Sequence, residues 1–444
     1  MDDTIYAFAT APGRAGVAIL RLSGPGAADA VRALAGRLPT PRHALVAEFK
    51  DPQSGELIDR GLALYFPAPA SLTGEDVAEL HVHGGRAVAG ALVGVLAARP
   101  GLRLAEPGEF SRRAFLNGKL DLTAAEGIAD LVAAETAAQR RQALRQMAGE
   151  AGRIYEDWRV RLLKAQARVE AEIDFPDEGL LADLAAEVAA ELAQIQGEIG
   201  AFLADDRRGE RLRDGLAVAI LGPPNAGKSS LLNALARRDV AITAATAGTT
   251  RDVIEVALDL GGFPVTLADT AGLRESRDAI EEEGVRRARA RAASADLKLV
   301  VVDATRPGEA PAVAAVVDRD CVVVANKMDL APADAARWTD ALGVGATVKI
   351  SVTTGSGLAD LETRLAAEIA RRFGGESAPL ITRARHRHAL TAAAAALERY
   401  PQAGAPELAA EELRQAVNAV GRITGRVGVE DLLDVVFREF CIGK

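Results

Sequence analysis

The sequence predicts a multidomain protein of α/β and α type, in which an α/β domain is inserted into a helical-bundle domain that follows an N-terminal α+β domain. The chain has 444 residues, more than one hydrophobic core usually organises. Residues 120–212 are rich in Ala, Glu, Arg and Leu with few helix breakers, whereas strand-like apolar runs alternate with helical stretches from residue 213. Such alternation is typical of a mostly parallel, doubly wound sheet.

The composition restricts the class of protein. Hydrophobic residues make up 49% and charged residues 26%, as in globular chains. The longest uncharged run, residues 87–98, is shorter than the roughly 20 residues that cross a bilayer, so we expect a buried helix there and no membrane segment. Two cysteines, Cys321 and Cys441, exclude a disulfide framework. Without a basic, apolar leader, a cytoplasmic location is expected.

Four segments follow from the change of pattern along the chain. Short apolar runs at residues 17–22, 63–66 and 77–82 predict strands, and the three-to-four spacing of apolar residues from Leu184 to Phe202 predicts an amphipathic helix. Helical composition returns after residue 379. We expect an N-terminal domain at residues 1–118 and a helical domain in two parts, at residues 119–212 and 375–444. A further domain, residues 213–374, is inserted between these two parts.

A phosphate-binding loop is predicted after the strand-like run 216–221. The segment Gly222-Pro-Pro-Asn-Ala-Gly-Lys228-Ser229 satisfies the Walker A pattern and precedes a helical stretch, which is the context the pattern needs. Backbone N–H groups and the helix N-terminus then surround the phosphates, Lys228 reaches the β- and γ-oxygens, and the Ser229 hydroxyl ligates Mg²⁺.

The base is predicted to be guanine. Asn326-Lys-Met-Asp329 follows the apolar run 321–325, and the Asp329 carboxylate can accept hydrogen bonds from the guanine N1–H and 2-amino groups, which adenine does not offer. Ser351-Val-Thr353 follows a further predicted strand as the loop behind the base. The expected ligands are therefore GTP and GDP.

Two further segments are expected to sense the γ-phosphate. Asp269-Thr-Ala-Gly272 places a carboxylate near the Mg²⁺ shell, and Gly248-Thr-Thr-Arg-Asp252 offers Thr250 as a second Mg²⁺ contact. Leu273 stands where Ras-like enzymes keep the glutamine that orients the attacking water, so another group must assist hydrolysis.

The pairs His81/His83 and His386/His388 lack a neighbouring carboxylate or cysteine cluster and are interpreted as structural.

The whole chain resembles the MnmE (TrmE) family of tRNA-modification GTPases, which act on the wobble uridine. The segments that carry this resemblance are Ala11-Pro-Gly-Arg-Ala-Gly-Val17, Thr73-Gly-Glu-Asp-Val77, Pro107-Gly-Glu-Phe-Ser111, Ala114-Phe-Leu-Asn-Gly-Lys-Leu-Asp121, Asp174-Phe-Pro-Asp177 and Phe440-Cys-Ile-Gly-Lys444.

The resemblance implies a homodimer with an N-terminal folate-binding domain, and GTP hydrolysis (EC 3.6) stimulated by K⁺ through dimerisation of the G domains. With a flavoprotein of the MnmG (GidA) family, in a heterotetramer, such a protein adds a carboxymethylaminomethyl or aminomethyl group to C5 of uridine 34 of certain tRNAs. The carbon comes from a tetrahydrofolate derivative, 5,10-methylene or 5-formyl. No Gly-x-Gly-x-x-Gly fingerprint occurs in this chain, so the partner brings FAD.

The resemblance also implies site residues. Asn225 coordinates K⁺ with Ala244, Thr246 and Thr249, although Ala244-Ala245-Thr246 departs from the usual Thr-Asp-Ile, and Glu281 orients the attacking water indirectly. The folate is held by Arg21, Glu79, Lys119 and Lys444, and Cys441 is either a thiol beside it or inert. The nucleotide-binding residues are Asn225, Ala226, Gly227, Lys228, Ser229, Ser230, Ala244, Ala245, Thr246, Ala247, Gly248, Thr249, Thr250, Asp269, Thr270, Ala271, Gly272, Asn326, Lys327, Asp329, Ser351, Val352 and Thr353.

Two other functions compete with this interpretation. A ribosome-assembly GTPase switch of the Era or Der type needs no folate, but its RNA-binding C-terminal domain or second G domain is missing here. A folate enzyme with a merely regulatory G domain is the other competing function.

The net charge of −9 argues against a protein that coats nucleic acid non-specifically, so tRNA contact is expected to be local, at one of three basic stretches. These stretches are residues 139–145, 286–291 and 383–387.

Overall fold

A computed structural model describes most of the chain. The described residues are 3–174, 181–238, 240–242, 255–269, 295–314, 317–318, 320–331, 342, 347–374, 381–428, 430–438, 440 and 442–443. They form two compact units, one of residues 1–129, 145–196 and 392–444 and the other of residues 130–144 and 197–391. This division does not test the four predicted domain boundaries, which stay predictions.

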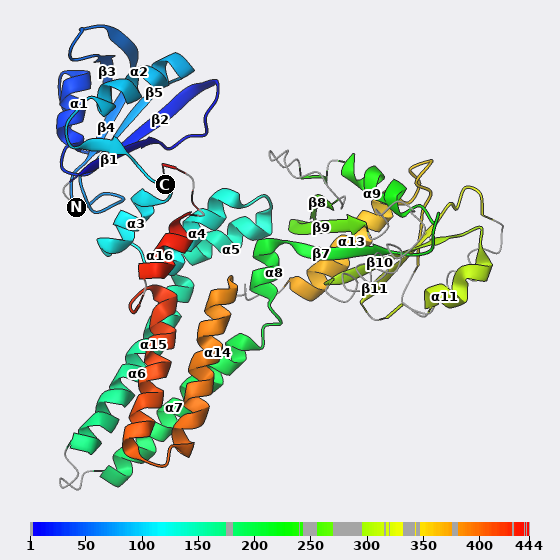
Figure 1. Cartoon of the computed structure of the whole chain (residues 1–444). Coiled ribbons are helices and arrows are strands. Elements are labelled where there is room, and N and C mark those ends of the chain that lie inside the picture. Colours follow the sequence, from blue (N-terminus) through cyan, green and yellow to red (C-terminus); the bar gives the residue numbers. More distant parts are fainter. Residues whose placement is uncertain are drawn as a thin grey trace, which may run out of the picture. The chain divides into compact units, whose positions relative to one another are not determined.

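The first unit begins with a six-stranded sheet in the order β3-β4-β5-β2-β1-β6 (Figure 1). Neighbouring strands are antiparallel except for β1 and β6, which are parallel. The strands are β1 (Thr4–Phe8), β2 (Ala15–Ser23), β3 (Leu45–Lys50), β4 (Leu57–Phe66), β5 (Val77–Gly84) and β6 (Leu102–Leu104). The strands predicted at residues 17–22, 63–66 and 77–82 are confirmed.

Helices cover the two faces of this sheet unequally. On one face, α1 (Ala27–Ala35) and α2 (Arg86–Ala97) pack on a core of alternating strand residues such as Leu20, Leu22 and Leu80. On the other face, α3 (Glu109–Leu116) lies against β1 through a cluster of Ile5, Ala7, Ala105 and Phe110. The side chains of β2 and β5 that point to this second face include Arg21 and Glu79, which are register partners.

The prediction of a buried helix at residues 87–98 was wrong in one respect. The helix exists as α2, but only Leu92 and Leu96 are buried in it. A Cβ added at Gly90 or Gly94 would meet nothing within 4 Å, and Ala87, Ala91 and Ala97 are exposed. The uncharged run therefore forms a helix that is buried along one side only, with glycine and alanine on its outer side.

The helical part of the first unit continues from the sheet. Its helices are α4 (Leu122–Ala133), α6 (Glu150–Asp174), α15 (Pro406–Thr424) and α16 (Glu430–Arg438), with parts of α5 (Ala137–Met147), α7 (Leu181–Leu203) and α14 (Ala384–Arg399) and the short η3 (Tyr400–Gln402). The helix predicted between Leu184 and Phe202 is confirmed as α7. Helices α6 and α15 pack along each other, and a Cβ added at Gly421 of α15 would lie 3.6 Å from the Arg159 side chain of α6.

The last described residues lie against the N-terminal sheet and α3. Ile442 forms an antiparallel bridge with Pro107, and a Cβ on Gly443 would lie 2.2 Å from the Phe8 carbonyl oxygen. Phe437 and Phe440 of the C-terminal region pack with Leu122 in one buried cluster. The N-terminal sheet domain and the chain's C-terminal residues are thus parts of one packed body.

The second unit contains a six-stranded sheet in the order β12-β11-β10-β7-β9-β8 (Figure 1). All pairs are parallel except β8 and β9. The strands are β7 (Leu216–Leu221), β8 (Glu255–Leu260), β9 (Phe263–Asp269), β10 (Leu297–Asp303), β11 (Cys321–Asn326) and β12 (Val348–Lys349), and the helices are α8 (Arg208–Asp214), α9 (Lys228–Ala236), η2 (Pro307–Glu309), α11 (Ala310–Ala314) and α13 (Leu358–Phe373).

Apolar side chains of this sheet face both ways, as the prediction of a doubly wound sheet requires. In β10, Leu299 and Val301 join the cluster that α9 and α13 cover, whereas Val300 and Val302 join a second cluster with Val313 of α11. Among the described residues, none of the helices combines the length and the apolarity that a bilayer-spanning segment needs.

Candidate functional site

A loop at residues 222–229, here called the phosphate loop, leaves the sheet at its topological switch point. It follows β7, which pairs with β9 on one side and with β10 on the other, so the chain crosses from one half of the sheet to the other around it. Gly222 has φ 139°, and a Cβ there would lie 2.0 Å from the Val301 carbonyl oxygen. Only glycine lets the loop pass this close to β10.

The phosphate loop curls around its own lysine. Asn225 and Gly227 have positive φ values of 62° and 96°, and α9 begins at Lys228 directly after them. Lys228 is 8% exposed, and its Nζ donates hydrogen bonds to the carbonyl oxygens of Gly222 (2.9 Å) and Pro223 (2.8 Å). The loop therefore presents backbone N–H groups, a helix N-terminus and an ammonium group at one place, which is the arrangement that binds phosphates.

A single buried amide joins the phosphate loop to the base loop, residues 351–353. Asn326, the last residue of β11, is 3% exposed. Its Nδ2 donates to the Ala226 carbonyl oxygen (2.9 Å), and its Oδ1 accepts from the Val352 N–H (3.1 Å). A Cβ on Gly227 would lie 2.3 Å from this Nδ2, so the glycine makes the bridge possible.

Asp303 holds the next residue, Lys327, in place. Asp303 ends β10 opposite Asn326 and is 2% exposed, and its Oδ2 lies 2.7 Å from Lys327 Nζ. Its Oδ1 accepts from the Thr305 N–H (3.0 Å) and hydroxyl (2.6 Å). Burial alone would raise the pKa of Asp303, but the hydrogen bonds from Lys327 and Thr305 outweigh it and keep the pKa below 3.8. The carboxylate is thus ionised at neutral pH.

The base loop is itself a closed turn. Ser351 is 2% exposed, its N–H donates to the Ser356 carbonyl oxygen (2.9 Å), and its Oγ accepts from the Thr354 N–H (3.2 Å). Asp329, two residues after Lys327, is exposed. The bonds through Asn326 place this loop beside the strand end that carries Asp329, which brings the predicted base-binding segments together.

Several predicted residues lie outside the described part of the chain. They are Ala244, Ala245, Thr246, Ala247, Gly248, Thr249, Thr250, Thr270, Ala271, Gly272, Glu281, Cys441 and Lys444. Asp269 is described only in its backbone, which ends β9 beside Ile220 of β7 and so lies at the same sheet edge as the phosphate loop. The roles predicted for these residues stay predictions.

The predicted folate residues divide into a pair and a separate lysine. Arg21 donates from Nε to Glu79 Oε1 (2.9 Å), and Glu79 Oε2 lies 3.3 Å from His81 Nε2. Lys119 instead donates from Nζ to the Pro69 carbonyl oxygen (2.8 Å), and among the described contacts none joins it to Arg21 or Glu79. His83 faces Asp59, and within the described residues no group of three His, Cys, Asp or Glu side chains is placed to hold a metal ion.

Sequence reasoning missed two supporting residues. Asp303 follows directly on the apolar run 297–302 and precedes Thr305, a position that resembles the other strand-end acids and was a usable signal. His81 was considered only as a metal ligand, yet its ring faces Glu79. Both act on a neighbouring predicted residue rather than on a ligand directly.

Comparisons with known proteins cover nearly the whole chain. The family model of the MnmE helical domain matches residues 122–441, and that of the GTP-binding protein TrmE N-terminus matches residues 4–119. The tRNA modification GTPase MnmE of Parvibaculum lavamentivorans is 57% identical over 452 residues and covers 100% of both chains. The protein of the same name from Rhodospirillum rubrum is 56% identical and covers 100% of this chain and 99% of its own.

A similar protein from an animal extends the comparison. A mitochondrial 5-taurinomethyluridine-tRNA synthase subunit of Danio rerio is 48% identical over 467 residues, with 100% of this chain and 93% of that protein covered. The similarity therefore includes the N-terminal sheet and the helices as well as the nucleotide-binding unit.

The ion pair beneath the site gives a pH-dependent prediction. We expect Asp303→Asn to lower the stability of the second unit by about 1–3 kcal/mol at neutral pH, because Lys327 loses a buried charged acceptor. In the folded protein the pKa of Asp303 is lowered from its ordinary value of 3.8. The stabilisation is therefore present at pH values above 3.8 and is lost as the pH falls through the folded pKa. Calorimetry of the transition that GDP shifts should show a Tm difference that shrinks on acidification.

The exposed Asp360→Asn in the first turn of α13 is the matched control and should leave that transition nearly unchanged at every pH. A Tm difference for Asp303→Asn that is equally large at neutral pH and at pH about 3 would contradict the role assigned to this carboxylate.

Proposed function

The chain belongs to the MnmE family of tRNA-modification GTPases, and from this premise we propose that it works with a flavoprotein of the MnmG (GidA) family on the wobble uridine. The pair would add a carboxymethylaminomethyl or aminomethyl group to C5 of uridine 34 of certain tRNAs. The observation that carries the proposal is the extent of the similarity, which covers 100% of this chain in relatives named for tRNA modification. The Danio rerio relative is named for a modified uridine.

The family hydrolyses GTP, and the described geometry supports a separate role for each residue of the nucleotide site. The Lys228 ammonium is held inside the phosphate loop by the Gly222 and Pro223 carbonyl oxygens, and its charge would stabilise the β- and γ-phosphate oxygens once the nucleotide replaces these contacts. Ser229, in the first turn of α9, offers a hydroxyl to Mg²⁺, and Thr250 is proposed as its second protein contact. Asp329 selects guanine.

We further propose that hydrolysis is assisted by K⁺ and by pairing of two G domains, as in the family. Leu273 leaves this chain without a glutamine to orient water, and a cation between the β- and γ-phosphates would neutralise the developing charge. Asn225 supports this role, because it lies in the phosphate loop and carries an amide oxygen that can ligate a cation. The oxygens of Ala244, Thr246 and Thr249 would complete the K⁺ site, and Glu281 would orient the water.

The one-carbon unit is proposed to come from a tetrahydrofolate derivative held on the N-terminal sheet. The Glu79 carboxylate suits the amidine edge of a pterin, and cations such as Arg21, Lys119 and Lys444 suit its glutamyl tail. The bound folate would supply a methylene group at the oxidation level of formaldehyde. Homodimerisation, the FAD-bearing partner, the chemical role of Cys441 and a cytoplasmic location belong to the same proposal.

A ribosome-assembly GTPase switch is the alternative. It would use the same phosphate loop, base loop and Asn326 bridge. It leaves the Arg21–Glu79 pair without a ligand, and it does not account for similarity to tRNA-modification proteins over the N-terminal sheet. The tRNA-modification function therefore explains more of the molecule.

Mass spectrometry of tRNA nucleosides tests the proposal. Cells that lack this protein should lose the C5-modified wobble uridine, and the wild-type protein should restore it. We expect Lys228→Ala to restore none of it, because phosphate binding is lost, while the exposed Lys164→Ala on α6 restores it fully. Unchanged modification in the deleted strain, or full restoration by Lys228→Ala, would overturn the proposal.

The cation requirement gives a second prediction. GTP hydrolysis should be about tenfold or more faster in KCl than in NaCl of equal ionic strength. Asn225→Gly removes the side chain without straining the positive φ, and it should bring the two rates close together. Asn233→Ala, exposed on α9, serves as the control and should keep the wild-type ratio. A wild-type ratio in Asn225→Gly would exclude this residue as a K⁺ ligand.

A further inference from the structure

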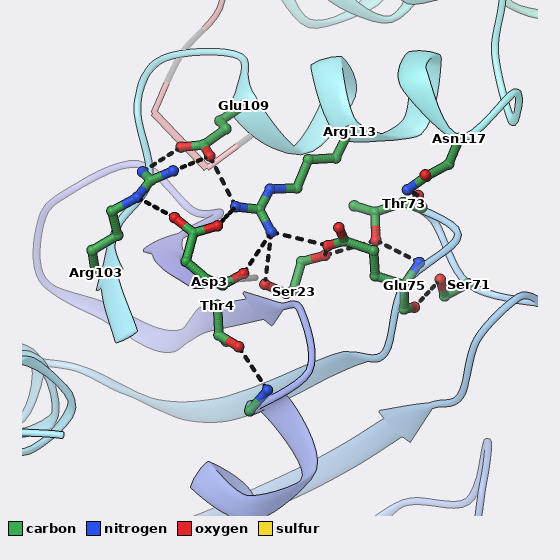
Figure 2. A network of polar contacts seen from close by, with 11 residues as sticks. Asp3, Thr4, Ser23, Ser71, Thr73, Glu75, Arg103, Glu109, Arg113 and Asn117 are labelled. Carbon is green, nitrogen blue, oxygen red and sulfur yellow. Dashed lines mark hydrogen bonds and ion pairs between the residues drawn. The ribbon is translucent and has the colours of Figure 1, made fainter. Parts of the chain in front are cut away.

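A fully buried arginine joins three segments of the N-terminal sheet domain (Figure 2). Arg113 of α3 is 0% exposed. Its Nη2 lies 2.8 Å from Asp3 Oδ1 and 3.1 Å from Glu109 Oε1, and its Nη1 lies 3.1 Å from Glu75 Oε2. The guanidinium thus connects α3 with the residue before β1 and with the loop before β5.

A second arginine and the hydroxyl group of Ser23 complete this network (Figure 2). Arg103 of β6 donates from Nε to Asp3 Oδ2 (2.6 Å) and from Nη2 to Glu109 Oε1 (2.6 Å). Ser23, the last residue of β2, donates from Oγ to Glu75 Oε2 (2.8 Å). Burial alone would raise the pKa of Glu109, but the hydrogen bonds from Arg103 and Arg113 keep it below 4.5, so the Glu109 carboxylate is ionised at neutral pH.

Buried ion networks contribute little net stability compared with apolar packing, because each charge loses its hydration. What such a network does provide is a fixed geometry. The segments fixed here are α3 and the ends of β2 and β5, since Ser23 closes β2 and Glu75 precedes β5 by two residues.

Phe110 connects the network to the Arg21–Glu79 pair. It lies one turn before Arg113 on α3, is 0% exposed and packs on Ile5 and Ala7. The Cζ atom of Arg21 lies 5.9 Å from the centre of its ring, within the range of a cation–π contact. Its ring therefore limits where the guanidinium of Arg21 can go.

Arg21 in turn fixes one side of the Glu79 carboxylate. Its Nε and Nη2 both lie 2.9 Å from Glu79 Oε1, while Oε2 lies 3.3 Å from His81 Nε2. The side chains of Arg21 and Glu79 are 20% and 17% exposed. The pair thus contacts the buried ring of Phe110 and is still partly accessible to solvent.

We propose that Phe110, and Arg113 through α3, are positioning residues for the Arg21–Glu79 pair. The ring of Phe110 holds the guanidinium, the guanidinium holds Glu79 Oε1, and the carboxylate then presents a fixed edge to a planar, amidine-bearing ligand of the pterin class. This inference rests on the proposed folate-binding function of the pair. It adds two residues that do not touch the ligand themselves.

Phe110→Leu tests the proposal, because it keeps an apolar side chain in the core and removes only the aromatic face. The matched control is Phe49→Leu, a change of equally buried phenylalanine in the core under α1 and α2. We expect calorimetric titration with 5-formyltetrahydrofolate to show affinity about fivefold weaker in Phe110→Leu and nearly unchanged in Phe49→Leu. Both variants should lower the Tm by a similar amount. Equal affinity in the two variants would overturn the proposal.

Arg113→Lys is the second variant, because lysine keeps the charge but cannot form the forked contacts to three carboxylates. It should also weaken 5-formyltetrahydrofolate, whereas Arg399→Lys, at an exposed pair with Glu412, should not. Neither change should alter GTP hydrolysis, since both lie outside the nucleotide site. Wild-type folate affinity in Arg113→Lys would exclude its positioning role.

A ligand-free measurement separates this inference from the folate proposal. In protein with isotope-labelled arginine, the Nε–H resonance of Arg21, assigned by its loss in Arg21→Lys, should shift and broaden in Phe110→Leu and stay unchanged in Phe49→Leu. An unchanged resonance in Phe110→Leu overturns the inference. A wild-type protein that does not bind 5-formyltetrahydrofolate, with the resonance shifted as expected, would instead overturn the folate proposal.

Discussion

The nucleotide site depends on one amide side chain. Asn326 ends β11 and bonds at the same time to the Ala226 carbonyl oxygen and to the Val352 N–H. The first bond holds the phosphate loop and the second holds the base loop. Both loops are separate in sequence, and each alone would have freedom to move. Because the amide is buried, either bond is costly to lose, so the two ends of a nucleotide meet a site whose spacing is already set.

The rest of the second unit serves this arrangement. Parallel strands bring the ends of β7, β10 and β11 to one edge, and the absence of side chains at Gly222 and Gly227 allows the phosphate loop to lie against Val301 and Asn326. The buried Asp303 carboxylate then fixes Lys327 through an ion pair. The N-terminal sheet uses the same principle with charges, since Arg113 fixes α3 and two strand ends around Arg21 and Glu79. In both units a buried polar side chain determines the geometry of an exposed site.

Local patterns predicted what local physics determines. The strands that precede the phosphate loop and Asn326, the amphipathic α7 and the inserted parallel sheet all follow from periodicity and were confirmed. Asp303 stands directly after a strand-like run, which was a usable signal, but its partner Lys327 follows a different strand and became known only from the structure. Two partners of Arg113 could not be predicted, since Asp3 and Glu75 reach it only through tertiary packing, whereas Glu109 is its local partner one turn earlier on α3. The segments around Glu75 and Glu109 were noticed only as family resemblance, and the structure supplies their physical reason. The exposed side of α2 was mistaken for core because alanine and glycine carry no charge. These small residues are nevertheless tolerated on a solvent-facing side as well as in a core.

Hydrogen exchange in the nucleotide-free protein tests directly whether Asn326 holds the two loops. In Asn326→Ala the amide of Val352 loses its acceptor, and its exchange should accelerate about tenfold or more. The neighbouring Ile350 amide, which donates to the Ala325 carbonyl oxygen, should keep its wild-type rate and show that β12 is intact. Faster exchange at Val352 with Ile350 unchanged is the result that this account predicts. An unchanged rate at Val352 would contradict it, because the base loop would then be held without the Asn326 side chain.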